Sequence, residues 1–291
     1  MTGETSANGP GDGSIRLVKG PDYDPVYSGR GLPDTFLVPL HNIEQIIVTP
    51  STSPKSDGML QVVIVPTGAT VASAALKDRP EIIHFKWPDR DADESLGGQV
   101  ATPMVKDGKA TYLSVLQAAL DQLLAPYDKK VIVYSDEAQA ADPSLKFKCS
   151  ATRTSTLDVN EKAEGSFFFL STGILWLSQT ILYLPFSSLE AVHTIFMRDV
   201  ASKTPEDGAP IVAMAVLISV SEQFRESQQD QTTANILNFE DVEDFTSMGS
   251  SIKKYCEAHG VGFVKLQQTY YNYAAGEMMT GYSPWTNETG G

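Results

Sequence analysis

The sequence predicts an α+β fold of two tandem strand-rich barrels, each closed by a C-terminal helix. Two observations predict it. Short runs of apolar, β-branched and aromatic residues recur between turn-type residues, as in antiparallel sheets. Two groups of these runs are each followed by a helical pattern, the first after Thr111 and the second near Val242. A curved sheet plugged by a helix buries its apolar face and protects its edges.

Composition and charge narrow the class of protein. The chain has 291 residues, of which 42% are hydrophobic and 20% charged, so it is long enough for two globular domains. Its net charge of −14 argues against binding nucleic acid through the overall field. The charge serves solubility, attraction to a basic partner, or both. Cys149 and Cys256 are far apart, so we expect two reduced core thiols in an intracellular protein.

The first domain is expected at 34–134, after a flexible N-terminal tail at 1–33. The tail is rich in Gly, Pro, Ser and Asp, with one weak strand at 15–18. Within the domain, a polar loop at 88–109 precedes a helix capped by Thr111 and stopped by Pro126. Strands are predicted at 35–38, 43–48, 59–65, 81–87 and 131–134.

The second domain is expected at 145–262, after a linker at 135–144. Residues 165–189 carry no charge, but polar interruptions at strand-length spacing favour buried strands over a membrane span. A second helix with a buried stripe from Val242 to Cys256 ends at Gly260. Strands are predicted at 145–152, 165–170, 174–177, 180–184, 189–197, 211–220 and 235–239.

The remaining residues, 263–291, form an aromatic-rich C-terminal extension that contains Tyr270, Tyr271, Tyr273 and Trp285. Two interpretations stay open for it. It packs back on the fold, or it docks a partner or a second copy of the chain, because Tyr and Trp are favoured in interfaces.

Small basic clusters are the candidate nucleic-acid contacts. Strand alternation places Lys146 and Lys148 on one face, where they contact phosphate or simply discourage edge aggregation. We expect DNA binding through these clusters to be weak at most, given the acidic chain. The candidate residues are Lys129, Lys130, Lys146, Lys148 and Arg153.

Nothing in the sequence favours catalysis. The histidines, His41, His84, His193 and His259, do not have metal-ligand spacing. No nucleophile elbow, dinucleotide fingerprint or phosphate loop occurs. We therefore expect a protein that is not an enzyme and binds no cofactor or metal.

Two stretches carry a family resemblance. The first runs from Thr35 to Val48 and continues through 60–66, 82–88 and the Thr111 helix. The second joins 164–176 to 181–192, with a glycine-aromatic hairpin and a Pro-Phe-x-x-Leu-Glu step. Together they resemble the tandem pleckstrin-homology (PH) region of fungal histone chaperones of the regulator of Ty transposition type. The small subunit of the FACT complex shares this fold, and the resemblance covers roughly residues 35 to 260.

The resemblance implies a nuclear, non-catalytic chaperone that deposits histones three and four during nucleosome assembly. It also implies that the second domain contacts histone three, including an acetylated lysine, through the end of the 189–197 strand and the start of the second helix. This chain has an extra segment at 201–209 and no glutamine near that helix start. The implied histone-binding residues are Thr194, Arg198, Lys203, Thr204 and Asp241.

Two alternatives to a chaperone stay open. One is a PH-type adaptor that binds a non-histone protein or peptide through the loop 198–210 or the aromatic extension. The other is a phosphoinositide-binding PH domain, which requires a basic first hairpin that neither domain clearly has.

Overall fold

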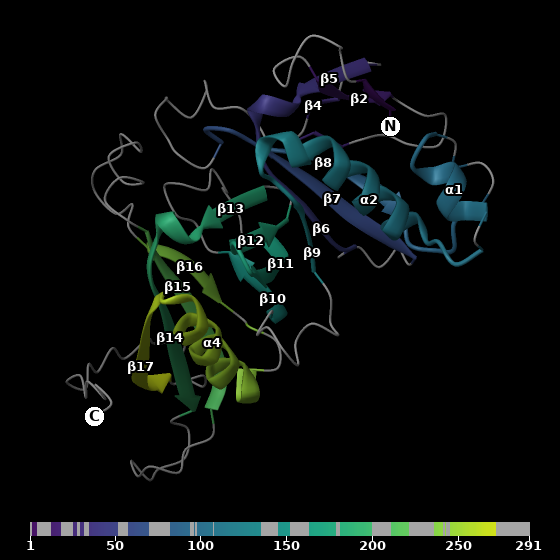
Figure 1. Cartoon of the computed structure of the whole chain (residues 1–291). Helices are drawn as coiled ribbons and strands as arrows, with labels where there is room; N and C mark the ends of the chain where they lie inside the picture. Colours follow the sequence, from purple (N-terminus) through teal and green to yellow (C-terminus); the bar gives the residue numbers. More distant parts are fainter. Residues whose placement is uncertain are drawn as a thin grey trace. The chain divides into compact units, whose positions relative to one another are not determined.

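The computed structural model divides the chain into two compact units, 1–138 with 181–183, and 139–180 with 184–291. The helices and strands fall in one unit or the other (Figure 1), except that the first three residues of β13 (Ile181–Pro185) are grouped with the first unit although the strand belongs to the sheet of the second. The structure describes residues 2–4, 13–18, 26–27, 30–31, 35–51, 58–69, 82–93, 96, 98–106, 108–134, 145–151, 163–178, 181–199, 211–220, 236–240, 242 and 245–271.

The first unit is built on a three-stranded sheet in the order β1-β2-β5 and a four-stranded sheet in the order β8-β7-β6-β9. All neighbours are antiparallel except β6 and β9, which are parallel. A small hairpin joins β3 to β4. The strands are β1 (Thr2–Glu4), β2 (Ser14–Val18), β3 (Val26–Tyr27), β4 (Arg30–Gly31), β5 (Thr35–Pro39), β6 (Ile43–Pro50), β7 (Met59–Pro66), β8 (Ile83–Pro88) and β9 (Val131–Val133).

Helix α2 (Tyr112–Leu124) begins where the sequence predicts. The Thr111 hydroxyl accepts from the Ser114 amide at 3.1 Å, and the Ser114 hydroxyl accepts from the Thr111 amide at 2.9 Å. This reciprocal pair satisfies two backbone donors that a helix start leaves unpaired. Tyr112, Val115, Leu116, Leu120 and Leu124 are the buried side chains of the helix.

One core joins both sheets of the first unit to α2. Ile15 and Leu17 of β2 belong to it and are 0% and 8% exposed. The strand expected at 15–18 is therefore present as β2, and alternate residues of it are buried. Other members are Val38, Leu40, Ile46, Val62, Ile64, Phe85, Leu116, Leu120 and Val131.

A short helix, α1 (Ala101–Lys106), lies in the segment predicted to be a loop. Ala101 is buried with Ala110 and Val115 in a small satellite cluster, and Met104 packs against it. One helical turn and a half has too few apolar residues for a periodic signal, so packing rather than pattern fixes this helix.

The second unit has one eight-stranded sheet in the order β13-β12-β11-β10-β16-β15-β14-β17. Strand β10 pairs with both β11 and β16 and so joins two antiparallel meanders. The strands are β10 (Leu145–Ala151), β11 (Ala163–Leu170), β12 (Gly173–Leu177), β13 (Ile181–Pro185), β14 (Leu189–Asp199), β15 (Ile211–Val220), β16 (Ile236–Glu240) and β17 (Gly262–Tyr271).

Helix α4 (Phe245–His259) packs on this sheet through aromatic side chains. Tyr255 is fully buried and meets Phe169 edge-to-face with ring centroids 4.8 Å apart. His259, in the last helical turn, stacks on Phe186 at 4.7 Å. Gly260 follows the helix with φ of 66°, a left-handed conformation that ends helices at little cost in glycine.

The charge-free stretch from 165 to 189 is strand-rich, as predicted, and no described helix is long and apolar enough to cross a membrane. Both cysteines are buried, and neither is part of a disulfide. Residues 263–271, predicted to belong to an extension, instead form most of β17, which pairs in parallel with β14.

The α+β class is confirmed, whereas two closed barrels are not seen. Over the described ranges no sheet closes on itself: the second sheet has β13 and β17 as its edges, and the first unit has separate sheets. In the second unit, β10 joins the two meanders because it pairs with both β11 and β16. In the first unit, the two sheets stay separate, because no described strand pairs with both β1 and β8.

The two units nevertheless repeat one strand pattern. In each, a short 3-10 turn leads from one meander into a second meander of β6-β7-β8 or β14-β15-β16. A helix follows, and then a strand, β9 or β17, that returns in parallel beside β6 or β14. The chain therefore folds the same supersecondary sequence twice.

The repeat extends to single residues. Pro39 precedes the first 3-10 turn and Pro185 the second, and each turn leads directly into β6 or β14. The strand registers also match, because Ile46 pairs with Ile64 as Val192 pairs with Ile218. In both ladders the pairing register shifts shortly before these pairs, at Glu44 in the first unit and at Glu190 in the second.

Candidate functional site

The sheet of the second unit has one face covered by α4. Val192, Thr194 and Phe196 alternate along β14 on this face, and the first two are fully buried. A Cβ on Gly249 of α4 would lie 2.5 Å from the Phe196 ring, so the helix and the sheet are in direct contact there. This face is the core of the unit.

The opposite face of the same strands is the candidate site, and we name it the His193 face. Cross-strand pairing aligns His193 with Leu217 on β15 and Val264 on β17. These side chains are half-buried, and His193 Nε2 lies 2.8 Å from the Ser219 hydroxyl. The His193 face comprises Ala191, His193, Ile195, Leu217, Ser219 and Val264.

The structural repeat gives an internal reference for this face. The matched registers equate Ile47 and Val63 of the first unit with His193 and Leu217 of the second. Ile47, Val63 and neighbouring Val65 are all 0% exposed. Their equivalents in the second unit, His193 and Leu217, are half-buried.

Burial lowers the pKa of two histidines below their ordinary value of 6.5. His84 lies within 2.8 Å of the Gln61 amide nitrogen, and for His193 the Glu190 carboxylate opposes part of the burial effect. Both rings are consequently neutral near neutral pH. His84 lies in β8 with a half-buried ring whose Nδ1 is hydrogen-bonded to Gln61.

The lowered pKa values predict a pH dependence of stability. The unfolded state binds these protons more readily, so the stabilisation is complete above about pH 6.5 and is lost as pH falls through the folded pKa values. Thermal unfolding from about pH 7.5 to about pH 5 should show a falling midpoint. The His84→Gln, His193→Gln double variant should show a flatter profile; an unchanged slope would contradict the assignment.

The implied histone-binding residues are placed only in part. Thr194 lies in β14 with no exposed surface, so its side chain does not reach the protein surface here. Arg198 lies near the end of β14, but its side chain lies outside the described set. Lys203, Thr204 and Asp241 also lie outside the described residues.

Burial of Thr194 has a consequence for stability. Its hydroxyl has no hydrogen-bond partner in the described part of the chain, nor has that of Thr49 in β6. An unpaired buried hydroxyl costs free energy that a methyl group of the same shape does not. We expect Thr194→Val to raise the free energy of unfolding by about 1 kcal/mol, measured by denaturant titration.

A control makes that measurement specific. Ser219→Ala also removes a hydroxyl from the sheet, but this hydroxyl bonds His193, so we expect a loss of about 0.5 to 1 kcal/mol instead. Destabilisation by Thr194→Val would show that the Thr194 hydroxyl is satisfied after all.

Of the basic candidates, Lys146 and Lys148 lie on one face of β10, as alternation predicts. Lys148 is exposed, whereas Lys146 is half-buried with its ammonium 5.7 Å from the centroid of the buried Phe168 ring. A cation over an aromatic face is partly stabilised within the protein, so Lys148 is the more accessible charge.

The other basic candidates are less available. The Lys129 ammonium donates to the Ile43 carbonyl and so ties the turn before β9 to the start of β6. Lys130 is exposed, and its carbonyl accepts from the Gln45 amide at 2.8 Å. Arg153 lies outside the described residues. Of the described side chains in this set, those of Lys130 and Lys148 are exposed.

Two findings describe the metal-binding and thiol chemistry of the described residues. They contain no group of three or more His, Cys, Asp or Glu side chains that could hold a metal ion. Burial raises the pKa of the Cys256 thiol to about 12, aided by the nearby Glu257 carboxylate, so the reactive thiolate is disfavoured.

No protein-family model matches the chain, and no curated protein matches it.

Proposed function

We propose that the chain is a non-catalytic histone chaperone whose two units are PH-like and which binds histones three and four. The observation that carries the proposal is the strand order of the second unit. Two antiparallel meanders, β10-β11-β12-β13 and β14-β15-β16, are joined through β10 and β16 and are followed by α4. Seven strands in this order with a C-terminal helix are what the sequence resemblance leads us to expect.

The structural repeat supports the tandem part of the proposal. The matched ladders and bulges at Glu44 and Glu190 favour two copies of one unit over two unrelated domains. The −14 charge of the chain supports a basic partner, because complementary fields accelerate encounter and favour binding.

Gel filtration with a reconstituted histone three–four complex at moderate salt tests the proposal. We expect co-elution, and we expect cytochrome c, a basic protein that is not a histone, to elute separately. If the histone complex also elutes separately, the chaperone proposal is overturned. If both basic proteins bind equally, the interaction reflects charge alone and the histone assignment is again overturned.

A further inference from the structure

We propose that the first unit accepts an extended segment of a partner protein as an added β-strand between β1 and β8. The segment runs antiparallel to β8 and carries apolar residues at alternate positions. Such binding goes beyond the chaperone function, because the first unit accepts the segment whether or not it belongs to a histone.

The strand orders of the two units differ at one position. In the second unit the order is β13-β12-β11, then β10, then β16-β15-β14-β17. In the first unit it is β5-β2-β1 and, in a separate sheet, β8-β7-β6-β9. Strands β5 and β13 both precede a 3-10 turn that leads into β6 or β14, so the two orders correspond strand by strand. Among the described residues of the first unit, no strand takes the place of β10 between β1 and β8.

Strand β10 shows which kind of segment fits this place. It is antiparallel to both of its neighbours, β11 and β16. Phe147 and Cys149 are buried, whereas Lys148 between them is exposed. A strand added to the first unit would likewise turn alternate side chains toward the core, beside Trp87, which packs on that core but is only half-buried. The segment that fits is therefore extended and apolar at every second residue.

The hydrogen-bond ladder of β8 directs alternate backbone groups away from β7. The Asp89 amide donates to the Gly58 carbonyl at 2.8 Å, and the same register continues along both strands. Bonded and non-bonded pairs alternate in an antiparallel ladder, so Phe85 and Trp87 bond β7 while His84 directs its amide and carbonyl to the other side. Backbone groups at a sheet edge supply the affinity when a strand is added.

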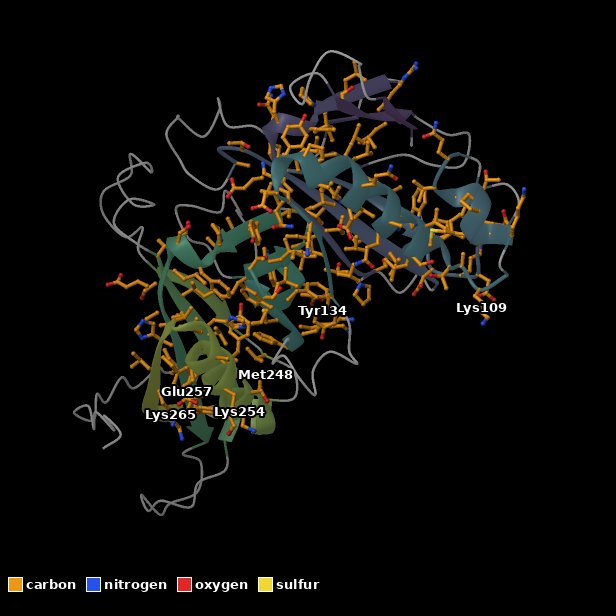
Figure 2. All side chains as sticks on the ribbon, in the orientation of Figure 1. Lys109, Tyr134, Met248, Lys254, Glu257 and Lys265 are labelled. Carbon is orange, nitrogen blue, oxygen red and sulfur yellow. The ribbon has the colours of Figure 1, made fainter. Side chains whose placement is uncertain are left out.

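The surroundings of β8 are consistent with this role. Strand β3 has Cα atoms within 8 Å of β8, but it pairs with β4 and not with β8. The other edge of the same sheet is β9, which Tyr134 follows (Figure 2) and which lies beyond β6. A strand at β8 would therefore connect the two sheets of the first unit, as β10 connects the two meanders of the second.

Peptide binding to the full chain tests the proposal. The probe is a fluorescein-labelled peptide of residues 145–151 with Cys149→Ala, which keeps the apolar alternation of β10. The control peptide also carries Phe147→Pro, which removes an amide and an inward side chain. We expect fluorescence anisotropy to show at least about tenfold weaker binding of the control peptide. Equal binding of the two peptides, or no binding of the first, overturns the proposal.

A matched pair of variants assigns the binding to the edge of β8. His84→Pro removes the outward amide, whereas His84→Ala removes the ring and its contact with Gln61 but keeps the amide. We expect His84→Pro to weaken peptide binding by about tenfold and His84→Ala by less than about twofold. Circular dichroism of both variants is required to match that of the unsubstituted protein. Equal affinities for the two variants would show that the peptide does not pair with β8.

Hydrogen exchange followed by NMR needs no variant. In the free protein we expect the His84 amide to exchange at least about tenfold faster than those of Phe85 and Trp87. Peptide at about ten times its dissociation constant should slow that exchange about tenfold. Slow exchange without peptide would mean that another part of the chain or a second copy already pairs there, which overturns the proposal. These results do not depend on histone binding, so failure of the chaperone function is distinguished from failure of strand addition.

Discussion

Replacing Gly173 with alanine should abolish stable folding of the second unit. Gly173 opens β12 after the turn from β11, with φ of 151°, where side-chain-bearing residues are strained. A Cβ there would lie 2.2 Å from the Leu184 carbonyl oxygen and 2.7 Å from the Pro185 Cα. Both are backbone atoms of β13, so no rotamer change relieves the overlap. We expect a loss of more than about 4 kcal/mol, which exceeds most single substitutions.

Gly68→Ala is the matched control. Gly68 also has a positive φ, 83°, but a Cβ there would meet no atom within 4 Å. It should therefore show only the conformational cost, about 1 kcal/mol. Hydrogen exchange followed by mass spectrometry should show loss of protection across β11, β12 and β13 in Gly173→Ala alone. Similar protection in both variants would mean that β13 does not approach Gly173 as closely as described.

Most strands and both long helices could be predicted because their signals are local. In α2 the Thr111 cap, the apolar stripe and Pro126 all lie within one short segment. The Pro-x-x-x-apolar-Glu step, at Pro39 and again at Pro185, marks the entry into β6 and β14. Such elements can be predicted from sequence because their capping residues, hydrophobic pattern and turn residues all indicate the same structure.

Strand β17 could not be predicted in the same way. Strand β17 pairs in parallel with β14 and follows α4 in the sequence, so no hairpin turn indicates this pairing. Its first residues include Lys265 and a glycine, Gly262, which weaken the strand pattern. The aromatic residues that follow were the stronger signal, and they favoured a separate extension over a strand.

The alternation of side chains along β14 could have predicted that Thr194 is buried. Its neighbours on the same strand face are Val192 and Phe196, which are the inward residues of β14. The bulge at Glu190 makes that register hard to fix without the paired strand. The His193 face was missed for another reason: it mixes apolar and polar side chains that are half-buried, and sequence alternation does not predict such a degree of burial.

Tyr255→Phe is expected to have the second-largest effect. The Tyr255 hydroxyl lies 2.6 Å from the Leu170 carbonyl oxygen and 3.0 Å from that of Gly173, and the side chain has no exposed surface. It donates to the turn that joins β11 to β12 and so fixes α4 against that hairpin. Removing it leaves buried carbonyl groups without this donor, and water cannot replace it. We expect a loss of about 2 kcal/mol in denaturant unfolding.

The same substitution at Tyr112 separates hydrogen bonding from loss of an oxygen atom. The Tyr112 hydroxyl contacts the Asp93 carboxylate at 3.3 Å, and the Asp93 side chain is 48% exposed, so water can take its place. Tyr112→Phe should therefore cost less than about 0.5 kcal/mol. In Tyr255→Phe, exchange protection should fall at Leu170 and across α4 while the edge-to-face packing on Phe169 is kept. Equal losses in the two variants would remove the buried hydroxyl as the link between helix and hairpin.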